Sequence, residues 1–242
     1  MPSRERPPAR RGGSTPTGEA FRSDGLDTPA VVGFLHRPTA DVRDGIVLTH
    51  GAGGNCNAPL LLALASAFAD AGVAALRVDL PYRQSRATGP PSPGGAARDR
   101  DGLRRAVGEL RQISDGRVFL GGQSYGGRQA SMLAADAPDV ADALLLLSYP
   151  LHPPGRATDL RTAHFPRLRT PALFVHGSLD PFGSLSDLDD ARRLAPASTE
   201  LLAIEGAGHG LARGRRVPPD TIARVVDAFV RFTGAHVASR RA

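Results

Sequence analysis

The chain has 242 residues, of which 41% are hydrophobic and 22% charged, a balance that fits one globular domain with a sizeable core. A single cysteine, Cys56, excludes an intramolecular disulfide and a zinc site built on cysteine pairs. The formal net charge is +6, but residues 23–212 hold eighteen arginines against twenty acidic residues. The positive excess lies at the two ends, which argues against a specific nucleic-acid-binding face.

The first segment, residues 1–18, is rich in Pro, Arg, Gly, Ser and Thr and has no apolar periodicity. This composition predicts a disordered basic tail. No apolar stretch follows the first arginines, and no window approaches 18 consecutive apolar residues, so the sequence predicts neither a signal peptide nor a membrane span. We therefore expect a cytoplasmic protein.

Short apolar runs alternate with segments of helical periodicity along the rest of the chain. The runs predict buried strands at residues 31–35, 46–48, 74–78, 118–120, 143–147, 172–175 and 201–204. The helical segments cover residues 58–71, 95–113, 126–136, 185–195 and 219–236. This alternation predicts an α/β fold with a mostly parallel central sheet and helices on both faces. The sheet is expected to begin with an antiparallel pair of strands at 19–23 and 31–36.

A Gly-x-Ser-x-Gly motif follows the expected strand at 118–120. It reads GQSYG over residues 122–126 and precedes a helical segment. A serine nucleophile in this position adopts a strained turn that holds its hydroxyl clear of the sheet, and side chains in place of the two flanking glycines would clash there. The motif predicts Ser124 as a nucleophile, with an ordinary serine at a helix N-terminus as the alternative.

An acid and a base follow two later strands, in the chain order serine, acid, histidine. Asp180 and His209 both lie on loops at the carboxyl ends of strands, where the chemistry of such sheets gathers. We predict that Asp180 orients His209 and that His209 takes the proton of Ser124. Glu205 and Asp79 are competing acids, but Glu205 precedes the histidine by only four residues and Asp79 lies upstream of the serine.

The loop HGAGG at residues 50–54 also follows a strand. We expect it to supply a backbone N–H that donates a hydrogen bond to the oxyanion of the tetrahedral intermediate. Two amides are needed, and we predict those of Tyr125 and Ala52, with Gly53 as the substitute for Ala52. A glycine-rich loop also occurs in phosphate sites, but neither G-x-G-x-x-G nor a P-loop lysine is present. We expect His50 to shape the loop and line the substrate site.

Four other residues lie near the ends of the expected strands. Arg83 and His152 are predicted to line the substrate site. The alternative for Arg83 is an ordinary surface arginine paired with an acidic residue. His176 is a further lining candidate. Cys56 is expected to be a small buried side chain and not the nucleophile.

Together, four motifs resemble the α/β-hydrolase superfamily over residues 19–236. They are HGAGG at 50–54, GGQSYGG at 121–127, HGSLDPFG at 176–183 and GAGHG at 206–210. Two more, DLPYR at 79–83 and SYPLHPPG at 148–155, resemble a subfamily of small hydrolases related to the dienelactone hydrolases, which also includes a eukaryotic chromatin-complex subunit. The resemblance implies an α/β-hydrolase domain over residues 19–238 and supports the roles of Ser124, Asp180, His209, Ala52 and Tyr125.

The expected function is that of a serine hydrolase that cleaves small carboxylic esters or thioesters through an acyl-enzyme. Only some twenty residues separate the expected strands at 143–147 and 172–175, which is too few for a large cap domain. A short connection favours an open site for small substrates. We expect no cofactor, no metal, no membrane and no specific nucleic acid as partner. The alternative is a hydrolase-fold scaffold or binding protein with little or no turnover.

Overall fold

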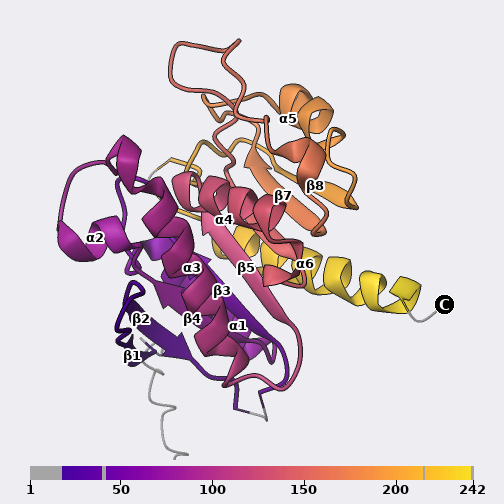
Figure 1. Ribbon diagram of the computed structural model, residues 1–242. Helices are drawn as coiled ribbons and strands as arrows, with labels where there is room; N and C mark the ends of the chain where they lie inside the picture. Colours follow the sequence, from indigo (N-terminus) through magenta and orange to yellow (C-terminus); the bar gives the residue numbers. More distant parts are fainter. Residues whose placement is uncertain (1–17, 40–41, 215, 241–242) are drawn as a thin grey trace, which may run out of the picture.

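The computed structural model describes residues 18–39, 42–214 and 216–240. Eight strands form one sheet in the order β1-β2-β4-β3-β5-β6-β7-β8 (Figure 1). Their bounds are β1 Glu19–Ser23, β2 Val31–His36, β3 Gly45–Thr49, β4 Ala74–Val78, β5 Val118–Gln123, β6 Leu144–Leu147, β7 Ala172–Gly177 and β8 Thr199–Ile204. Strands β3 to β8 are parallel and β1 pairs antiparallel with β2, as predicted. Strand β2 is also antiparallel to β4, a pairing that was not predicted.

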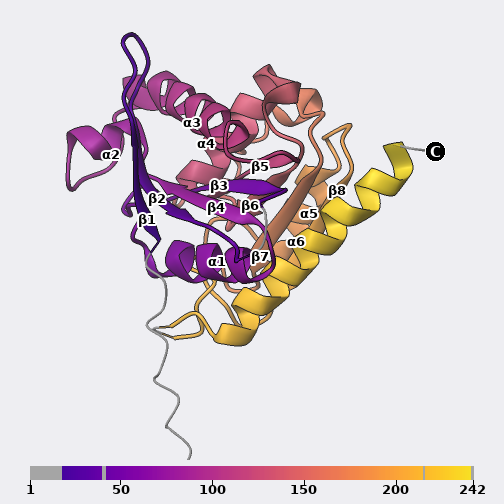
Figure 2. The same ribbon diagram turned by 90° about the horizontal axis from the view of Figure 1, so that it is seen from below.

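Helices cover both faces of the sheet, as Figure 2 shows. Their bounds are α1 Pro59–Asp70, α2 Pro81–Ser85, α3 Ala96–Arg111, α4 Tyr125–Asp136, α5 Leu185–Arg192 and α6 Pro219–Arg240. Buried leucines and alanines of α3, α4 and α5 pack with one side of the sheet, and those of α1 join the apolar face of α6 on the other. Each face of the sheet is therefore removed from water by its own core cluster.

The fold predicted from the sequence is confirmed, with differences of a few residues at the ends of elements. Helix α2 was not predicted; it begins at Pro81, whose fixed φ suits the first helical position. The connection between β6 and β7, residues 148–171, contains a single turn of 3₁₀ helix, η3 at Phe165–Arg167. Apart from Gly18, the predicted tail at 1–18 lies outside the described residues. None of the described helices is long and apolar enough to cross a bilayer.

The strand register brings five loops to one edge of the sheet. Thr49 of β3 lies opposite Gly122 of β5, and Gln123 lies opposite Leu147 of β6. On the next pair of strands, β7 and β8 end together at Gly177 and Ile204. The residues that follow these strands therefore meet above the same edge, where the predicted site residues lie.

Candidate active site

Ser124 occupies a strained turn between β5 and α4. Its φ is 50° and its ψ is −114°, in a region that side chains other than glycine rarely adopt. A Cβ added to Gly122 would lie 2.5 Å from the carbonyl carbon of Gly126, and one added to Gly126 would lie 2.5 Å from the carbonyl oxygen of His50. Both glycines are required because the turn brings three backbone segments together. The turn holds Ser124 at the N-terminus of α4.

Three side chains from separate loops form a continuous hydrogen-bonded chain. His209 Nε2 lies 2.8 Å from Ser124 Oγ, and His209 Nδ1 lies 2.8 Å from Asp180 Oδ2 and 3.0 Å from Oδ1. Since a carboxylate can only accept, Nδ1 carries the proton in the neutral imidazole. Nε2 is then free to accept the hydroxyl proton of the serine. The structure thus brings together the three residues that the sequence singled out.

The carboxylate of Asp180 is fully buried and oriented by its own turn. The backbone amide of Phe182 donates to Oδ1 at 2.9 Å, and the Phe182 ring lies 4.3 Å from the ring of His209. His176, also fully buried, donates from Nε2 to the carbonyl of Gly183 at 2.9 Å, and this nitrogen lies 3.7 Å from Asp180 Oδ2. The acid is therefore held on several sides before any substrate binds.

The two competing acids lie elsewhere. Glu205 is exposed and accepts a hydrogen bond from Ser178 Oγ at 2.9 Å. Asp79 accepts from the backbone amide of Cys56 at 2.6 Å, beside the start of α1. The geometry favours Asp180 over both as the partner of the histidine.

Backbone contacts fix the acid loop against the histidine loop. The amide of Leu179 donates to the carbonyl of Ala207 at 2.9 Å, and the amide of Gly206 donates to Ser178 Oγ at 2.9 Å. A Cβ on Gly177 would lie only 2.2 Å from the Ala207 oxygen. This close approach, which only glycine allows, sets the distance between the two loops.

The HGAGG loop lies directly against the serine. A Cβ added to Gly51 would be 3.4 Å from Ser124 Cβ and 3.9 Å from Ser124 Oγ. Within the part of the chain that the structure describes, the amide of Ala52 has no hydrogen-bond acceptor. The amide of Tyr125, at the first position of α4, has no acceptor within the helix. Two amides next to Ser124 are thus available to a ligand oxygen.

The carbonyls of this loop are held by side chains of α2. Tyr82 Oη donates to the carbonyls of Ala52 at 2.8 Å and Gly51 at 3.3 Å. Arg83 donates from Nε to Gly54 at 2.8 Å and from a terminal nitrogen to Ala52 at 3.0 Å. Its other hydrogen bonds are to carbonyls of the following loop, and it is 6% exposed. The geometry favours a role in holding the loop over the substrate contact suggested by the sequence.

A buried carboxylate that the sequence analysis missed joins α2, α3 and the serine turn. Asp99, fully buried in α3, accepts from the backbone amide of Tyr82 at 3.1 Å and from Tyr125 Oη at 2.7 Å. Burial, together with this hydrogen bond, raises the pKa of Tyr125, so its hydroxyl remains a donor. An acidic residue inside a helix carries no signal of its own, because only the fold shows what it faces.

The remaining predicted residues lie around the site with backbone partners. His50 is fully buried, accepts at Nε2 from the Leu80 amide at 3.2 Å and donates from Nδ1 to Gly51 at 2.8 Å; burial lowers its pKa. His152 donates from Nδ1 to the adjacent Pro153 carbonyl at 2.9 Å. Burial raises the pKa of Cys56 to about 12, which leaves its thiol protonated. No group of three or more potential metal ligands occurs among the described residues.

The strand order and the serine turn are those of an α/β hydrolase. A model of the family described as "Alpha/beta hydrolase domain" matches residues 42–238, and the chain belongs to this family.

Among solved structures, Est1E from Butyrivibrio proteoclasticus is similar, with a TM-score of 0.72 and 16% identity over 90% of this chain and 100% of that chain. A dienelactone hydrolase from Anabaena variabilis has a TM-score of 0.67 and 20% identity over 88% and 97%. Esterase 2 of Thermogutta terrifontis has a TM-score of 0.65 and 19% identity over 93% and 96%. At these identities the likeness shows the fold, and the neighbours are hydrolases.

Proposed function

We propose that this protein is a serine hydrolase that cleaves small carboxylic esters or thioesters through a covalent acyl-enzyme. The observation that carries the proposal is the unbroken chain from the buried Asp180 through His209 to Ser124, with 2.8 Å at each link. A strained serine at the end of a buried strand is retained at an energetic cost, which catalysis explains and helix capping does not. The esterases among the similar structures are consistent with this chemistry.

In the first half-reaction Ser124 Oγ attacks the carbonyl carbon of the ester while its proton passes to His209 Nε2. The negative charge that develops on the former carbonyl oxygen is stabilised by the amides of Ala52 and Tyr125. As the tetrahedral intermediate collapses, the bond to the leaving oxygen or sulfur breaks, and His209 gives the proton to the departing alcohol or thiol. Asp180 remains ionised and stabilises the imidazolium.

The second half-reaction repeats these steps with water. His209 takes a proton from a water molecule while the water oxygen attacks the carbonyl carbon of the acyl group. The bond from that carbon to Ser124 Oγ then breaks, and His209 returns the proton to the serine oxygen. The products are a carboxylic acid and the regenerated serine. No cofactor is needed at any step.

We also propose a substrate size and a cytoplasmic location for the protein. Since the β6–β7 connection contains one 3₁₀ turn and no helical cap, we assign short acyl chains to the site in preference to long-chain lipids. The single cysteine is buried and protonated, a condition that suits the reducing cytoplasm.

Steady-state hydrolysis of p-nitrophenyl acetate, p-nitrophenyl butyrate and acetyl thiocholine tests the proposal. The folded protein should cleave at least one of them, and Ser124→Ala should lose about a thousandfold or more of that rate. Ser66→Ala on α1 is the matched control and should keep the wild-type rate. A folded wild-type protein that turns over none of these substrates, or a Ser124→Ala variant with unchanged turnover, would favour the scaffold alternative.

A further inference from the structure

Two arginines, Arg128 on α4 and Arg161 on the β6–β7 connection, form no ion pair with a carboxylate among the described residues. Within the described residues, neither the Arg128 side chain nor the Arg161 side chain makes a hydrogen bond, an ion pair or a ring contact, although both are partly buried. The Nε atom of Arg128 is inaccessible to water and still unpaired. By contrast, Arg83 places its guanidinium on four backbone carbonyls. A partly buried guanidinium without acceptors is costly, and a pair of them is more so.

Arg128 lies one helical turn beyond the serine. Its backbone amide donates to the Ser124 carbonyl at 2.9 Å, and the two residues are separated by roughly 6 Å along the axis of α4. Arg128 shares the partly exposed side of α4 with Tyr125 and Met132, which are three positions before it and four after it. The guanidinium is therefore carried on the first turn of the helix that presents the nucleophile.

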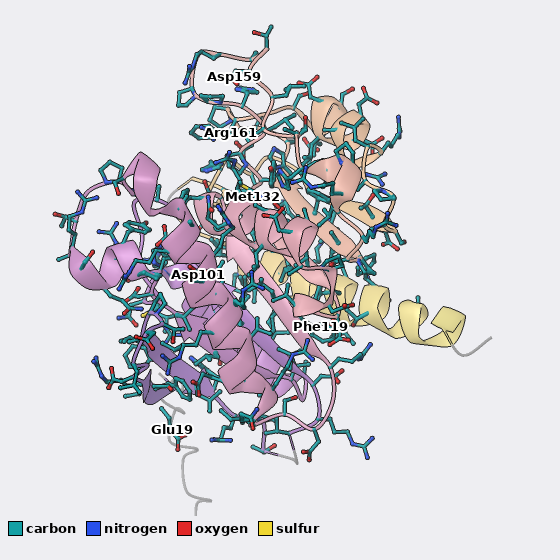
Figure 3. All side chains as sticks on the ribbon, viewed as in Figure 1. Glu19, Asp101, Phe119, Met132, Asp159 and Arg161 are labelled. Carbon is teal, nitrogen blue, oxygen red and sulfur yellow. The ribbon has the colours of Figure 1, made fainter. Side chains whose placement is uncertain are left out.

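Arg161 comes to the same region from the β6–β7 connection. Its amide donates to the carbonyl of Leu151 at 2.7 Å, and its carbonyl accepts from Tyr149 Oη at 2.7 Å. Tyr149 is fully buried two residues after the end of β6, so Arg161 is tied to the edge of the sheet that carries the site. In the view of Figure 3, Arg161 lies between the loop tip at Asp159 and α4 at Met132.

The electrostatic environment shows that the two guanidinium groups act on the same neighbours. Burial raises the pKa of Tyr149, and the charges of Arg128 and Arg161 both oppose that rise. Burial, and then the charge of Arg128, lower the pKa of Arg161. The same two causes lower the pKa of His164 to about 4, so this histidine is neutral at pH 7 and adds no positive charge of its own.

The acidic residues of this region already have partners. Asp159 lies 3.6 Å from Arg156 and its charge also acts on Arg161, without an ion pair between the two; Asp136 lies 3.1 Å from Arg167. Asp99 is occupied by Tyr82 and Tyr125, as described above. The two arginines thus leave a local excess of positive charge around Tyr149, at the edge of the sheet that carries Ser124.

We propose that Arg128 and Arg161 bind an anionic group on the substrate, so that the preferred substrates are short esters that carry a carboxylate in addition to the scissile bond. The inference rests on the proposed function and names the substrate class of that site. Guanidinium groups suit a carboxylate because they donate two parallel hydrogen bonds in a plane. The spacing of one helical turn suits an acid with a chain of a few carbon atoms between the carboxylate and the reacting carbonyl.

The test compares esters of equal length and different charge. The glutaric acid mono-p-nitrophenyl ester differs from p-nitrophenyl valerate only by a carboxylate in place of the terminal methyl group. We expect wild-type kcat/KM to be at least tenfold higher for the charged ester, with the ratio falling as NaCl rises from 20 to 500 mM. A second pair, 4-acetoxybenzoate and its methyl ester, places the charge on the alcohol side and distinguishes which half of the substrate the arginines bind.

Three variants assign the preference to the two arginines. Arg128→Gln and Arg161→Gln should each lower the ratio of charged to neutral kcat/KM about tenfold, and Arg128→Lys should retain more of it than Arg128→Gln. Arg169→Gln, an exposed position on the same connection, is the matched control and should leave the ratio unchanged. Equal rates for the charged and neutral members of both pairs, or a ratio unchanged in both glutamine variants, would overturn the inference.

Binding separates this inference from the hydrolase proposal. If no ester is cleaved, the proposed function fails, and calorimetry with glutarate on the wild-type protein decides the remaining question. Saturable glutarate binding that Arg128→Gln or Arg161→Gln weakens at least tenfold would support the anion site. Absence of binding in the wild-type protein, or binding that both variants retain, would refute it.

Discussion

Replacement of Asp180 by asparagine should remove nearly all activity and leave the fold intact. The amide of Phe182 donates to Oδ1 of Asp180, while Oδ2 faces His209 Nδ1 at 2.8 Å. In Asp180→Asn, the side-chain oxygen must stay on the Phe182 amide, since the reverse orientation would set two donors against each other at a cost of about 1–3 kcal/mol. The NH₂ group then faces His209 Nδ1.

This orientation selects the wrong tautomer of the histidine. The NH₂ group takes the nearer position, 2.8 Å from Nδ1 against 3.0 Å for the oxygen, and so favours an Nδ1 that accepts; Nε2 then carries the proton and no longer accepts from Ser124. The same exchange in a serine protease lowers kcat by about 10⁴, the value we adopt here, which corresponds to roughly 5 kcal/mol of transition-state stabilisation. The folded state keeps a neutral, hydrogen-bonded side chain at this position, so the midpoint of urea unfolding should change little.

The assay is kcat/KM for the best ester substrate, measured beside circular dichroism and urea unfolding. Glu205→Gln is the matched control, because the exposed glutamine can still accept from Ser178 and the rate should stay within about twofold of wild type. A folded Asp180→Asn variant with more than a tenth of the wild-type rate would refute the assignment of the acid.

Three further predictions concern the loop, the turn and pH. Arg83→Met removes the side-chain donor to the Gly54 carbonyl and one of the two donors to the Ala52 carbonyl, which loosens the loop that carries the Ala52 amide. The rate constant kcat should fall roughly tenfold or more with little change in KM, because oxyanion donors act mainly on the transition state; an unchanged kcat would contradict this. Gly126→Ala, whose Cβ would lie 2.5 Å from the His50 oxygen, should lower the unfolding free energy in urea by at least about 1–3 kcal/mol, and wild-type stability would disprove the steric argument. Burial lowers the pKa of His164 to about 4, below its value in the unfolded chain. Between these two pKa values the unfolded chain binds the proton more readily, so the unfolding free energy is at its full value above pH 6.5 and declines as pH falls towards 4. By pH 5 the loss is roughly 2 kcal/mol, and His164→Gln should show a shallower decline between pH 7 and pH 5; an equal slope would contradict it.

Much of the fold could be predicted because the buried strands are continuous apolar runs separated by clear helical periodicity. The motif positions could be predicted for a related reason: Ser124, Asp180 and His209 each follow such a strand, and parallel strands bring their carboxyl ends to one edge. Helix α2 escaped prediction because its five residues are too few to show a period. Pro81 suits its first position, but its arrangement also depends on contacts with the 50–54 loop.

The supporting contacts could not be predicted because they depend on what each side chain faces. Arg83 could be expected near the site, but its backbone carbonyl partners are visible only in three dimensions. Asp99 is an unremarkable acid inside a helix until the fold places Tyr82 and Tyr125 against it. For Arg128, the informative feature is the absence of a partner among the described residues, which no sequence pattern records.

The most direct test of the central claim is the site of covalent labelling by a fluorophosphonate, read by intact mass and peptide mapping. Attack of Ser124 Oγ on phosphorus expels fluoride and leaves one stable adduct that mimics the first tetrahedral intermediate. We predict one adduct per chain, on the peptide that contains Ser124, and its loss in His209→Gln, which lacks the base. An unlabelled wild-type protein that is folded, or an adduct on any other residue, would contradict the proposed mechanism.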